Sequence, residues 1–163
     1  MIKIVEFDEK YERPVIDLIV GIQRGEFGVN ITAEEQPDLA SIPEFYQTGN
    51  GNFWVALDED LPVGTISLKD IGNDEVALRK MFVDKRYRGA GSGVAKMLLE
   101  NSIAWAKRRN VESIYLGTTD AFRAAHRFYE KNGFRQIDKN RLPRTFPLMV
   151  QDTRFYWLKL SVG

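Results

Sequence analysis

The chain has 163 residues, enough for one domain, with 23 lysines and arginines against 23 aspartates and glutamates. Because the net charge is zero, no global field attracts nucleic acid or an anionic membrane. The absence of cysteine excludes disulfides, thiolate metal sites and a cysteine acyl-enzyme intermediate. The first residues lack the apolar region of a signal peptide, and no apolar run approaches the ~18 residues of a membrane span, so we expect a cytoplasmic protein.

The hydrophobic pattern predicts a mixed α/β chain. Residues 2–7 alternate like a strand, and apolar residues from Val15 to Ile22 follow the i, i+3, i+4, i+7 spacing of a helix. The polar, acid-rich segment 23–52 predicts loop with a short helix near 37–46. The other predicted strands are 53–57, 63–68, 76–83, 113–118, 134–137 and 153–160, and the other predicted helices are 91–109 and 121–131. We expect a single domain, 1–163, built on one mixed, mostly antiparallel sheet of about seven strands flanked by helices.

A glycine cluster in residues 81–94 carries the strongest functional signal. A predicted strand runs through a loop into Gly89, Gly91 and Gly93, which open a helix. Glycines let the backbone approach a ligand, and the first amides of a helix are unpaired donors at its positive end. Arg88 adds a positive charge. The stretch predicts a cradle for a pyrophosphate group, and a plain connecting turn is the alternative.

Other chemistries fit the sequence poorly. A Rossmann dinucleotide site needs a glycine directly after the strand, whereas residues 84–88 intervene here. Its ribose-binding acid should end the next strand, but Glu112 precedes that strand. A serine hydrolase is disfavoured because no Gly-x-Ser-x-Gly elbow exists. The single histidine, His126, borders an apolar stripe, which favours a partly exposed structural role. No ligand cluster indicates a metal.

Two motifs follow one another in the chain, Arg88-Gly-Ala-Gly-Ser-Gly93 and Ala125-x-x-Phe128-Tyr-Glu-Lys-x-Gly-Phe134. The first matches the pattern Arg/Gln-x-x-Gly-x-Gly/Ala of the GNAT superfamily of N-acetyltransferases, and the second resembles that family's second signature. The resemblance is strongest over residues 77–134. It implies a GNAT-like acyl-CoA N-acyltransferase fold and transfer of the acetyl group of acetyl-CoA to a primary amine, by direct attack in a ternary complex.

The resemblance also implies where coenzyme A binds. Its pyrophosphate is expected on the amides of the glycine loop, and its pantetheine arm in a gap between the fourth and fifth strands. The expected cofactor-binding residues are Met81, Phe82, Val83, Arg88, Gly89, Ala90, Gly91, Ser92, Gly93, Val94, Phe122 and Ala125. Tyr129 matches the family position that donates a proton to the departing thiolate, a core or rim aromatic being the alternative.

Two positions depart from the family pattern. Ala77 stands where many relatives carry a glutamate that takes the proton of the acceptor amine, and Phe122 stands where relatives often have asparagine. Glu75, a water chain or an acid of segment 23–52 are the alternatives for the base. The departures keep a second class open, a catalytically weak acyl-CoA-binding sensor or scaffold. Transfer to a hydroxyl and a longer acyl chain are also open.

The expected partner is a small-molecule or peptide amine, with no nucleic acid and no membrane. Acidic residues concentrate in segment 23–52, which favours a cationic amine, a solvated acidic loop being the alternative; they are Glu26, Glu34, Glu35, Asp38 and Glu44. The last strand carries Phe155, Tyr156 and Trp157, which face either a core or a second copy of the chain. This strand leaves a homodimer open.

Overall fold

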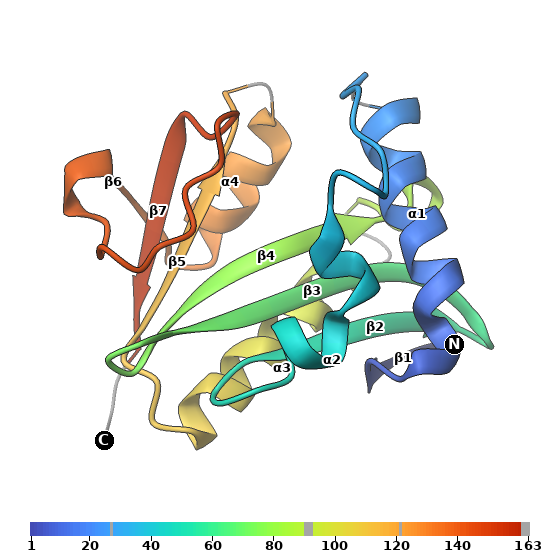
Figure 1. Cartoon of the computed structure of the whole chain (residues 1–163), viewed down its shortest axis with the longest axis horizontal. Helices are drawn as coiled ribbons and strands as arrows, with labels where there is room; N and C mark the ends of the chain where they lie inside the picture. The colour runs from blue at the N-terminus through green and yellow to red at the C-terminus, as the bar shows by residue number, and fades with distance from the viewer. Residues whose placement is uncertain (27, 90–92, 121, 161–163) are drawn as a thin grey trace.

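The computed structural model describes residues 1–26, 28–89, 93–120 and 122–160. One seven-stranded sheet forms its centre, in the order β1-β2-β3-β4-β5-β7-β6 (Figure 1). The strands are β1 (Ile2–Glu6), β2 (Asn52–Asp58), β3 (Leu61–Gly72), β4 (Glu75–Val83), β5 (Ser113–Thr118), β6 (Arg135–Ile137) and β7 (Arg154–Lys159). Every neighbouring pair is antiparallel except β4 with β5. The predicted mixed, mostly antiparallel sheet is confirmed.

Helices cover both faces of the sheet. They are α1 (Glu12–Gly25), the short α2 (Ile42–Phe45), α3 (Val94–Arg108) and α4 (Arg123–Lys131). In Figure 1, α1 and α2 lie in front of β1–β4, and α3 lies behind them. None of these helices is both long and apolar enough to cross a bilayer, among the residues that the structure describes.

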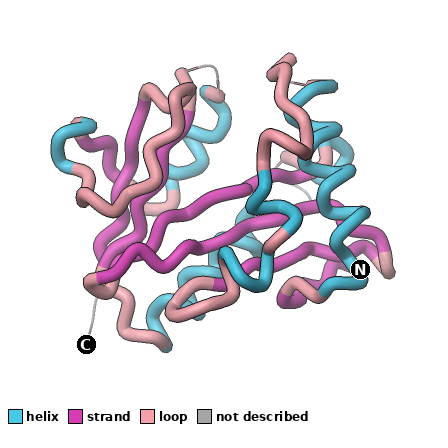
Figure 2. The backbone as a smooth tube through the Cα atoms, viewed as in Figure 1, coloured by secondary structure: helices cyan, strands magenta, loops and turns pink. Residues whose placement is uncertain are grey.

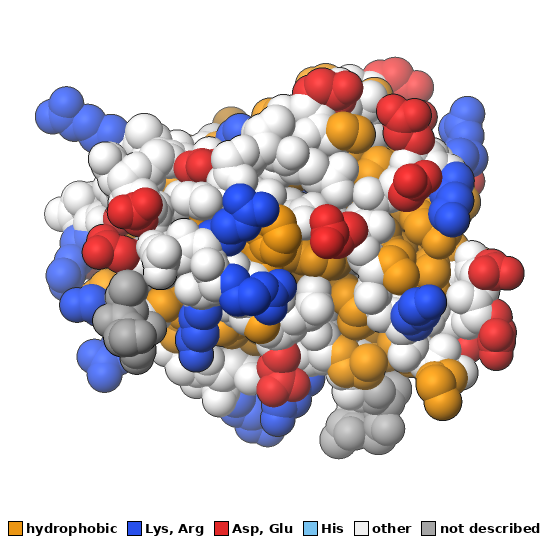
Figure 3. Space-filling view, turned by 90° about the horizontal axis from the view of Figure 1, so that it is seen from below, with side chains coloured by type: hydrophobic (Ala, Val, Ile, Leu, Met, Phe, Trp, Pro, Cys, Tyr) orange, Lys and Arg blue, Asp and Glu red, His pale blue; other side chains and the backbone are white. Residues whose placement is uncertain are grey.

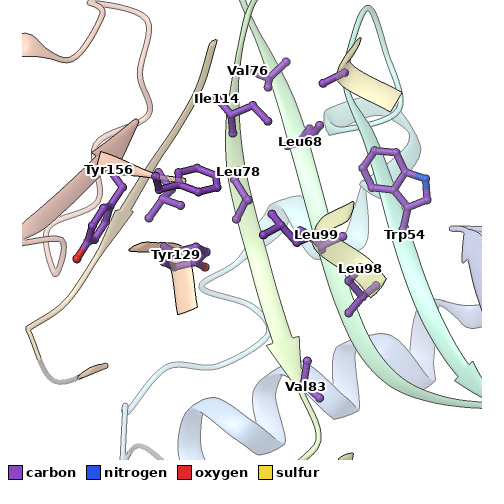
Figure 4. Close-up of a cluster of buried hydrophobic side chains, with 14 of the residues drawn as sticks. Trp54, Leu68, Val76, Leu78, Val83, Leu98, Leu99, Ile114, Tyr129 and Tyr156 are labelled. Carbon is purple, nitrogen blue, oxygen red and sulfur yellow. The ribbon is translucent and has the colours of Figure 1, made fainter. Parts of the chain in front are cut away.

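Strand β2 explains why two layers of helices are needed. Successive side chains of a strand point to opposite faces. Trp54 and Ala56 join the core cluster that contains α3, part of which Figure 4 shows, whereas Phe53 and Val55 join the cluster that contains α1. A strand that is apolar on both faces is stable only when both faces are covered.

The sheet consists of two groups of strands that diverge. β4 and β5 pair only through Glu75–Ala77 with Ser113–Tyr115, although both strands continue further. Figure 2 shows the backbones of β4 and β5 separating beyond this point. β5 is instead paired with β7 along its whole length. Beyond Ala77, no described strand pairs with the β5-facing edge of β4, so its backbone groups there are left to a ligand or solvent.

The aromatic side chains of the last strand, β7, make contacts within the chain. Phe155 and Tyr156 are buried in the protein's own core, and the half-buried Trp157 donates a hydrogen bond to the Ser113 hydroxyl at 3.0 Å. Phe155 and Tyr156 therefore face the protein's own core. On the face seen in Figure 3, basic and acidic side chains are interspersed, in line with their equal numbers.

Candidate active site

A β-bulge in β4 shapes the site. Thr65 of β3 pairs with Phe82 and Ser67 pairs with Arg79, so that Lys80 and Met81 together oppose one residue. Lys80 has a positive φ of 53°, which costs a residue with a side chain roughly 1–2 kcal/mol. Such strain is maintained by surrounding structure and concentrates at functional sites.

Two buried hydroxyl groups stabilise the bulge. The Thr65 hydroxyl donates a hydrogen bond to the carbonyl of Lys80, and the Ser67 hydroxyl donates one to the carbonyl of Arg79, both at 2.7 Å. Both side chains are fully buried. They replace the sheet hydrogen bonds that the bulge disrupts, since a buried carbonyl without a partner is costly.

A pocket of about 720 Å³ lies between the start of α3 and one face of α4. We call it the cationic pocket; the residues that line it are Tyr87, Arg88, Gly89, Gly93, Val94, Ala95, Lys96, Ala124, Arg127, Phe128, Lys131 and Asn132. Four of these residues are basic and none is acidic. Together with the amino-terminal end of α3, this donor set suits a pyrophosphate or phosphate group.

Part of the predicted cradle coincides with this pocket. Arg88, Gly89, Gly93 and Val94 line it, whereas residues 90–92, that is Ala90, Gly91 and Ser92, lie outside the described residues. Gly89 and Gly93 have φ values of 105° and 65°. Glycine is needed for these conformations because other residues are strained there. The predicted helix 91–109 begins at Val94, with Gly93 as its N-cap.

The structure adds three basic side chains to Arg88 in the predicted phosphate cradle. The Arg88 guanidinium forms an ion pair with Glu26, next to the end of α1. Lys96, Arg127 and Lys131 supply the other charges, and the sequence analysis missed them. The four-residue spacing of Arg127 and Lys131, which puts them on one face of a helix, was the available signal.

The other predicted cofactor residues lie along β4 and at the start of α4. Met81 and Val83 pack with the core that contains α3, and Phe82 packs against the core that contains α1. Phe122 is the N-cap of α4, and Ala125 packs on the main core. Phe122 and Ala125 do not line the cationic pocket.

Tyr129 of α4 lies between the two diverging groups of strands. Its ring contacts those of Phe128, Phe134 and Tyr156, with centroids 5.5–6.0 Å away. In Figure 4 its hydroxyl is on the side that faces β4. This hydroxyl makes no hydrogen bond within the part of the chain that the structure describes. Burial raises the pKa of Tyr129 well above its usual value, so the group stays a proton donor.

His126 anchors α4 and is buried, which corrects the partly exposed position expected from the sequence. Its Nε2 lies 2.7 Å from the Thr119 carbonyl oxygen, and its Nδ1 lies 3.2 Å from Nη1 of Arg154. Arginine only donates, so Nδ1 accepts and Nε2 carries the hydrogen. Next to it, the Tyr156 hydroxyl donates to Glu130 at 2.7 Å. The network holds the helix that carries Tyr129 against β7.

Several of the acids expected near the acceptor already have partners within the chain. Ala77, where relatives often have glutamate, is fully buried against Phe146 and Phe155. Glu75 lies at the paired end of β4 and accepts a hydrogen bond from the Tyr115 hydroxyl at 3.3 Å. In the acidic segment, Glu26 pairs with Arg88, Glu35 accepts hydrogen bonds from Thr32, and Asp38 pairs with Lys80.

A second pocket, of about 250 Å³, lies on the α1 side of β4. We call it the polar pocket; it is lined by Gln23, Ile31, Glu35, Gln36, Pro37, Asp38, Phe45, Arg79, Lys80, Met149 and Gln151. The Nζ of Lys80 lies 3.5 Å from Oδ2 of Asp38 and donates a hydrogen bond of 2.6 Å to Oε1 of Gln36. Burial lowers the pKa of Lys80, and Asp38 opposes that shift. The lining of this pocket contains two acidic residues, Glu35 and Asp38, and two basic residues, Arg79 and Lys80, so the hypothesis of a cationic acceptor stays a prediction.

The sequence analysis also missed Asp152, just before β7. A methyl group placed on Gly117 of β5 would lie 2.5 Å from Asp152 Oδ2, so the carboxylate occupies the space that a side chain at position 117 would fill. Burial raises the pKa of Asp152 to about 6, while a Met149 backbone hydrogen bond and the charge of Arg79 partly counteract that shift. The group therefore ionises close to neutral pH.

The sheet that opens between β4 and β5, with a cationic pocket beside the opening, defines a protein of the acyltransferase class. The family model described as Acetyltransferase (GNAT) family matches residues 17–134. The chain belongs to this family, which confirms the fold and the class of enzyme predicted from its two signatures.

Solved structures extend the likeness to nearly the whole chain. A GNAT-family acetyltransferase from Staphylococcus aureus MU50 is 41% identical, with a TM-score of 0.94 over 99% of this chain and 100% of that one. The PaiA N-acetyltransferase from Thermoplasma acidophilum, solved in complex with coenzyme A, shares the fold at a TM-score of 0.75 and 16% identity.

The curated relatives are longer proteins. N-acetylaspartate synthetase from Danio rerio is 38% identical over 102 residues, which are 61% of this chain and 36% of that protein. The human N-acetylaspartate synthetase is 37% identical over 102 residues. The chain thus spans about a third of the length of these relatives.

Proposed function

We propose that residues 1–163 form one N-acetyltransferase domain that transfers the acetyl group of acetyl-CoA to a primary amine by direct attack in a ternary complex. The observation that carries the proposal is the cationic pocket between α3 and α4, the two helices that follow the diverging strands β4 and β5. A cytoplasmic location, expected from the sequence, belongs to the same proposal.

The pocket and the strand edge suit the two ends of acetyl-CoA. In this proposal the basic residues and glycine amides of the cationic pocket bind the phosphates. The free edge of β4, from Leu78 to Val83, binds the amide groups of the pantetheine arm as a neighbouring strand would. The pocket and the strand edge together would deliver the thioester to the gap that Tyr129 faces.

Tyr129 is the proposed general acid. Its raised pKa keeps it protonated, and its hydroxyl has no competing partner among the described residues. When the amine attacks the thioester carbonyl carbon, the carbon–sulfur bond breaks and the departing thiolate takes the Tyr129 proton. A thiol with a pKa of about 8.5 is already a fair leaving group, so the acid accelerates the reaction without being indispensable.

Thermal unfolding of the purified chain with acetyl-CoA, coenzyme A and NAD tests the proposed cosubstrate. At about a hundredfold excess over the dissociation constant, a ligand that binds only the folded state adds ~2.7 kcal/mol and raises the midpoint by several degrees. We expect this shift with acetyl-CoA and coenzyme A but not with NAD. No shift with saturating acetyl-CoA would contradict the proposal.

A sensor or scaffold that binds acyl-CoA is the competing function, because Ala77 replaces the glutamate of many relatives. A steady-state assay of thiol release with a broad amine panel separates the two functions. Aspartate belongs in this panel because the curated relatives are named N-acetylaspartate synthetase. Continuous release with at least one amine identifies the enzyme, and binding without any release identifies the sensor.

A further inference from the structure

The β4 bulge sends two consecutive basic side chains into one pocket. In a regular strand, residues 79 and 80 would point to opposite faces. Here both Arg79 and Lys80 line the polar pocket, since two residues of β4 oppose one of β3. The strained backbone of Lys80 and the hydroxyls of Thr65 and Ser67 maintain this arrangement.

Arg79 and Lys80 differ in their partners. The charge of Lys80 is compensated by Asp38 at 3.5 Å. Arg79, in contrast, forms no ion pair with any residue that the structure describes. Its guanidinium lies 5.6 Å from the centre of the Phe45 ring, and its Nη2 lies 3.8 Å from the Met149 sulfur. These contacts orient the guanidinium without neutralising it, so its fork of N–H donors suits an incoming carboxylate.

Asp152 lies across the sheet opening from Arg79. The last paired residues of β4 and β5 are Ala77 and Tyr115. Arg79 and Gly117, against which Asp152 packs, are each two residues further along their strands. The charge of Arg79 acts on Asp152, yet the two side chains form no ion pair with one another. A positive and a negative group thus flank the opening at the same level.

We propose that Arg79 and Asp152 bind an acceptor that carries a carboxylate next to its amine, an α-amino acid. Arg79 binds the carboxylate, and Asp152 faces the ammonium group. The inference rests on the proposed function, because the site adjoins the gap in which the thioester is expected. Opposite charges on either side of an opening complement a zwitterion better than they complement a simple amine.

Asp152 also acts as the general base for the acceptor amine, a role that the side chain of Ala77 cannot fill. An ordinary alkylammonium has a pKa of about 10.4, so a proton must leave before the nitrogen can attack. The ammonium gives one proton to Asp152, and the nitrogen lone pair forms the bond to the thioester carbon. The nitrogen loses a second proton as the amide forms, and the thiolate gains the Tyr129 proton. The second proton from the nitrogen reprotonates the Tyr129 oxygen, and Asp152 releases the first proton to water.

The test measures thiol release at saturating acetyl-CoA with pairs of acceptors, each α-amino acid and its α-carboxamide. The carboxamide keeps the amine but has no negative charge. We expect the acids to have the higher kcat/KM. Arg79→Gln should raise KM for the acids about ten- to hundredfold and leave KM for the carboxamides unchanged.

Lys69→Gln is the matched control for Arg79→Gln. Lys69 lies over the same Phe45 ring at 4.1 Å but does not line the polar pocket, so its loss should change neither KM. Asp152→Asn should lower kcat for acids and carboxamides alike and remove the rise of kcat between about pH 5 and 7. Equal effects of Arg79→Gln on both acceptor types would overturn the carboxylate site.

Binding is measured separately, by saturation-transfer NMR of alanine and alaninamide with the coenzyme A complex. Preferential binding of alanine that disappears in Arg79→Gln supports the site, even when no acceptor is turned over. Selective binding without turnover would contradict the proposed function but not the carboxylate site. Efficient acetylation of carboxamides with rejection of the acids would contradict this inference and leave the proposed function intact.

Discussion

The Thr65 hydroxyl donates a 2.7 Å hydrogen bond to the carbonyl of Lys80, at the centre of the β4 bulge. The bond joins a fully buried side chain of β3 to a strained residue of β4. It secures the stretch of backbone that turns Arg79 and Lys80 into the polar pocket and continues toward the cationic pocket. A single hydroxyl group thus connects the stability of the sheet with the geometry of both pockets.

Replacing Thr65 by valine tests this connection. Thr65→Val keeps the size of the side chain but leaves the Lys80 carbonyl without its partner, which costs about 1–3 kcal/mol. We expect that loss in the free energy of unfolding by urea, together with a higher KM for the acceptor. Ser102→Ala is the control, because the Ser102 hydroxyl bonds the Leu99 carbonyl inside α3 and its loss should leave KM unchanged. An unaltered acceptor KM in Thr65→Val would separate the bulge from acceptor binding.

Tyr129→Phe removes the proposed proton donor and little else. We expect kcat to fall about 10²-fold, because general acid catalysis is lost, while the thermal shift with coenzyme A stays the same. Tyr115→Phe removes a hydroxyl that bonds Glu75 at the paired end of β4 and β5, so its kcat should be unchanged. Full turnover in Tyr129→Phe would rule out Tyr129 as the acid.

The basic face of α4 should govern affinity for coenzyme A. Arg127→Gln removes one charge from the cationic pocket, and we expect weaker binding by about tenfold and a smaller dependence of the dissociation constant on salt. Arg123→Gln removes an exposed charge from the same helix outside the pocket. Titration calorimetry should detect no change in that variant. Equal weakening by both substitutions would point to general electrostatics instead of a phosphate contact.

The left-handed glycine at the start of α3 should be irreplaceable. Gly93→Ala places a side chain at a φ of 65°, which costs roughly 1–2 kcal/mol and displaces the first amides of the helix. We expect a lower melting temperature and a loss of affinity for coenzyme A. Gly21→Ala, within α1 and with open space around it, should raise stability by about 0.5–1 kcal/mol without affecting that affinity.

The buried carboxyl of Asp152 should make stability depend on pH. Its pKa rises from 3.8 to about 6 on folding, so between these values the folded state binds more protons than the unfolded state. Wild-type stability therefore falls as the pH rises through this window. Asp152→Asn has no such titration, and its stability relative to the wild type should increase from pH 4 to pH 7.

Asp84→Asn should show the opposite trend. A hydrogen bond from the Arg86 side chain lowers the pKa of Asp84. The wild type therefore gains stability as the pH rises and Asp84 ionises. The stability of Asp84→Asn relative to the wild type should therefore fall as the pH rises through the acidic range. Parallel pH curves for Asp152→Asn and the wild type would contradict the assigned environment of Asp152. Chemical denaturation at fixed pH values measures both variants.

Local patterns were sufficient for the elements and for part of the site. Alternation and short apolar runs predicted all seven strands, because most of the strands bury apolar side chains of their own. The glycine loop was recognisable because a left-handed backbone needs glycine at Gly89 and Gly93. The two signatures identified the family, because the residues of each signature are contiguous in the chain.

The tertiary structure decided what lies together. The sequence order does not show that β7 inserts between β5 and β6. The family resemblance implied a gap between the fourth and fifth strands, but not that their pairing ends at Ala77 and Tyr115. Sheet order and register depend on contacts between distant residues, so no local pattern announces them. Arg79 and Asp152 are 73 positions apart (152 minus 79), and each alone reads as an ordinary surface charge. Only the bulge and the divergence of the strands bring these two charges to the same opening.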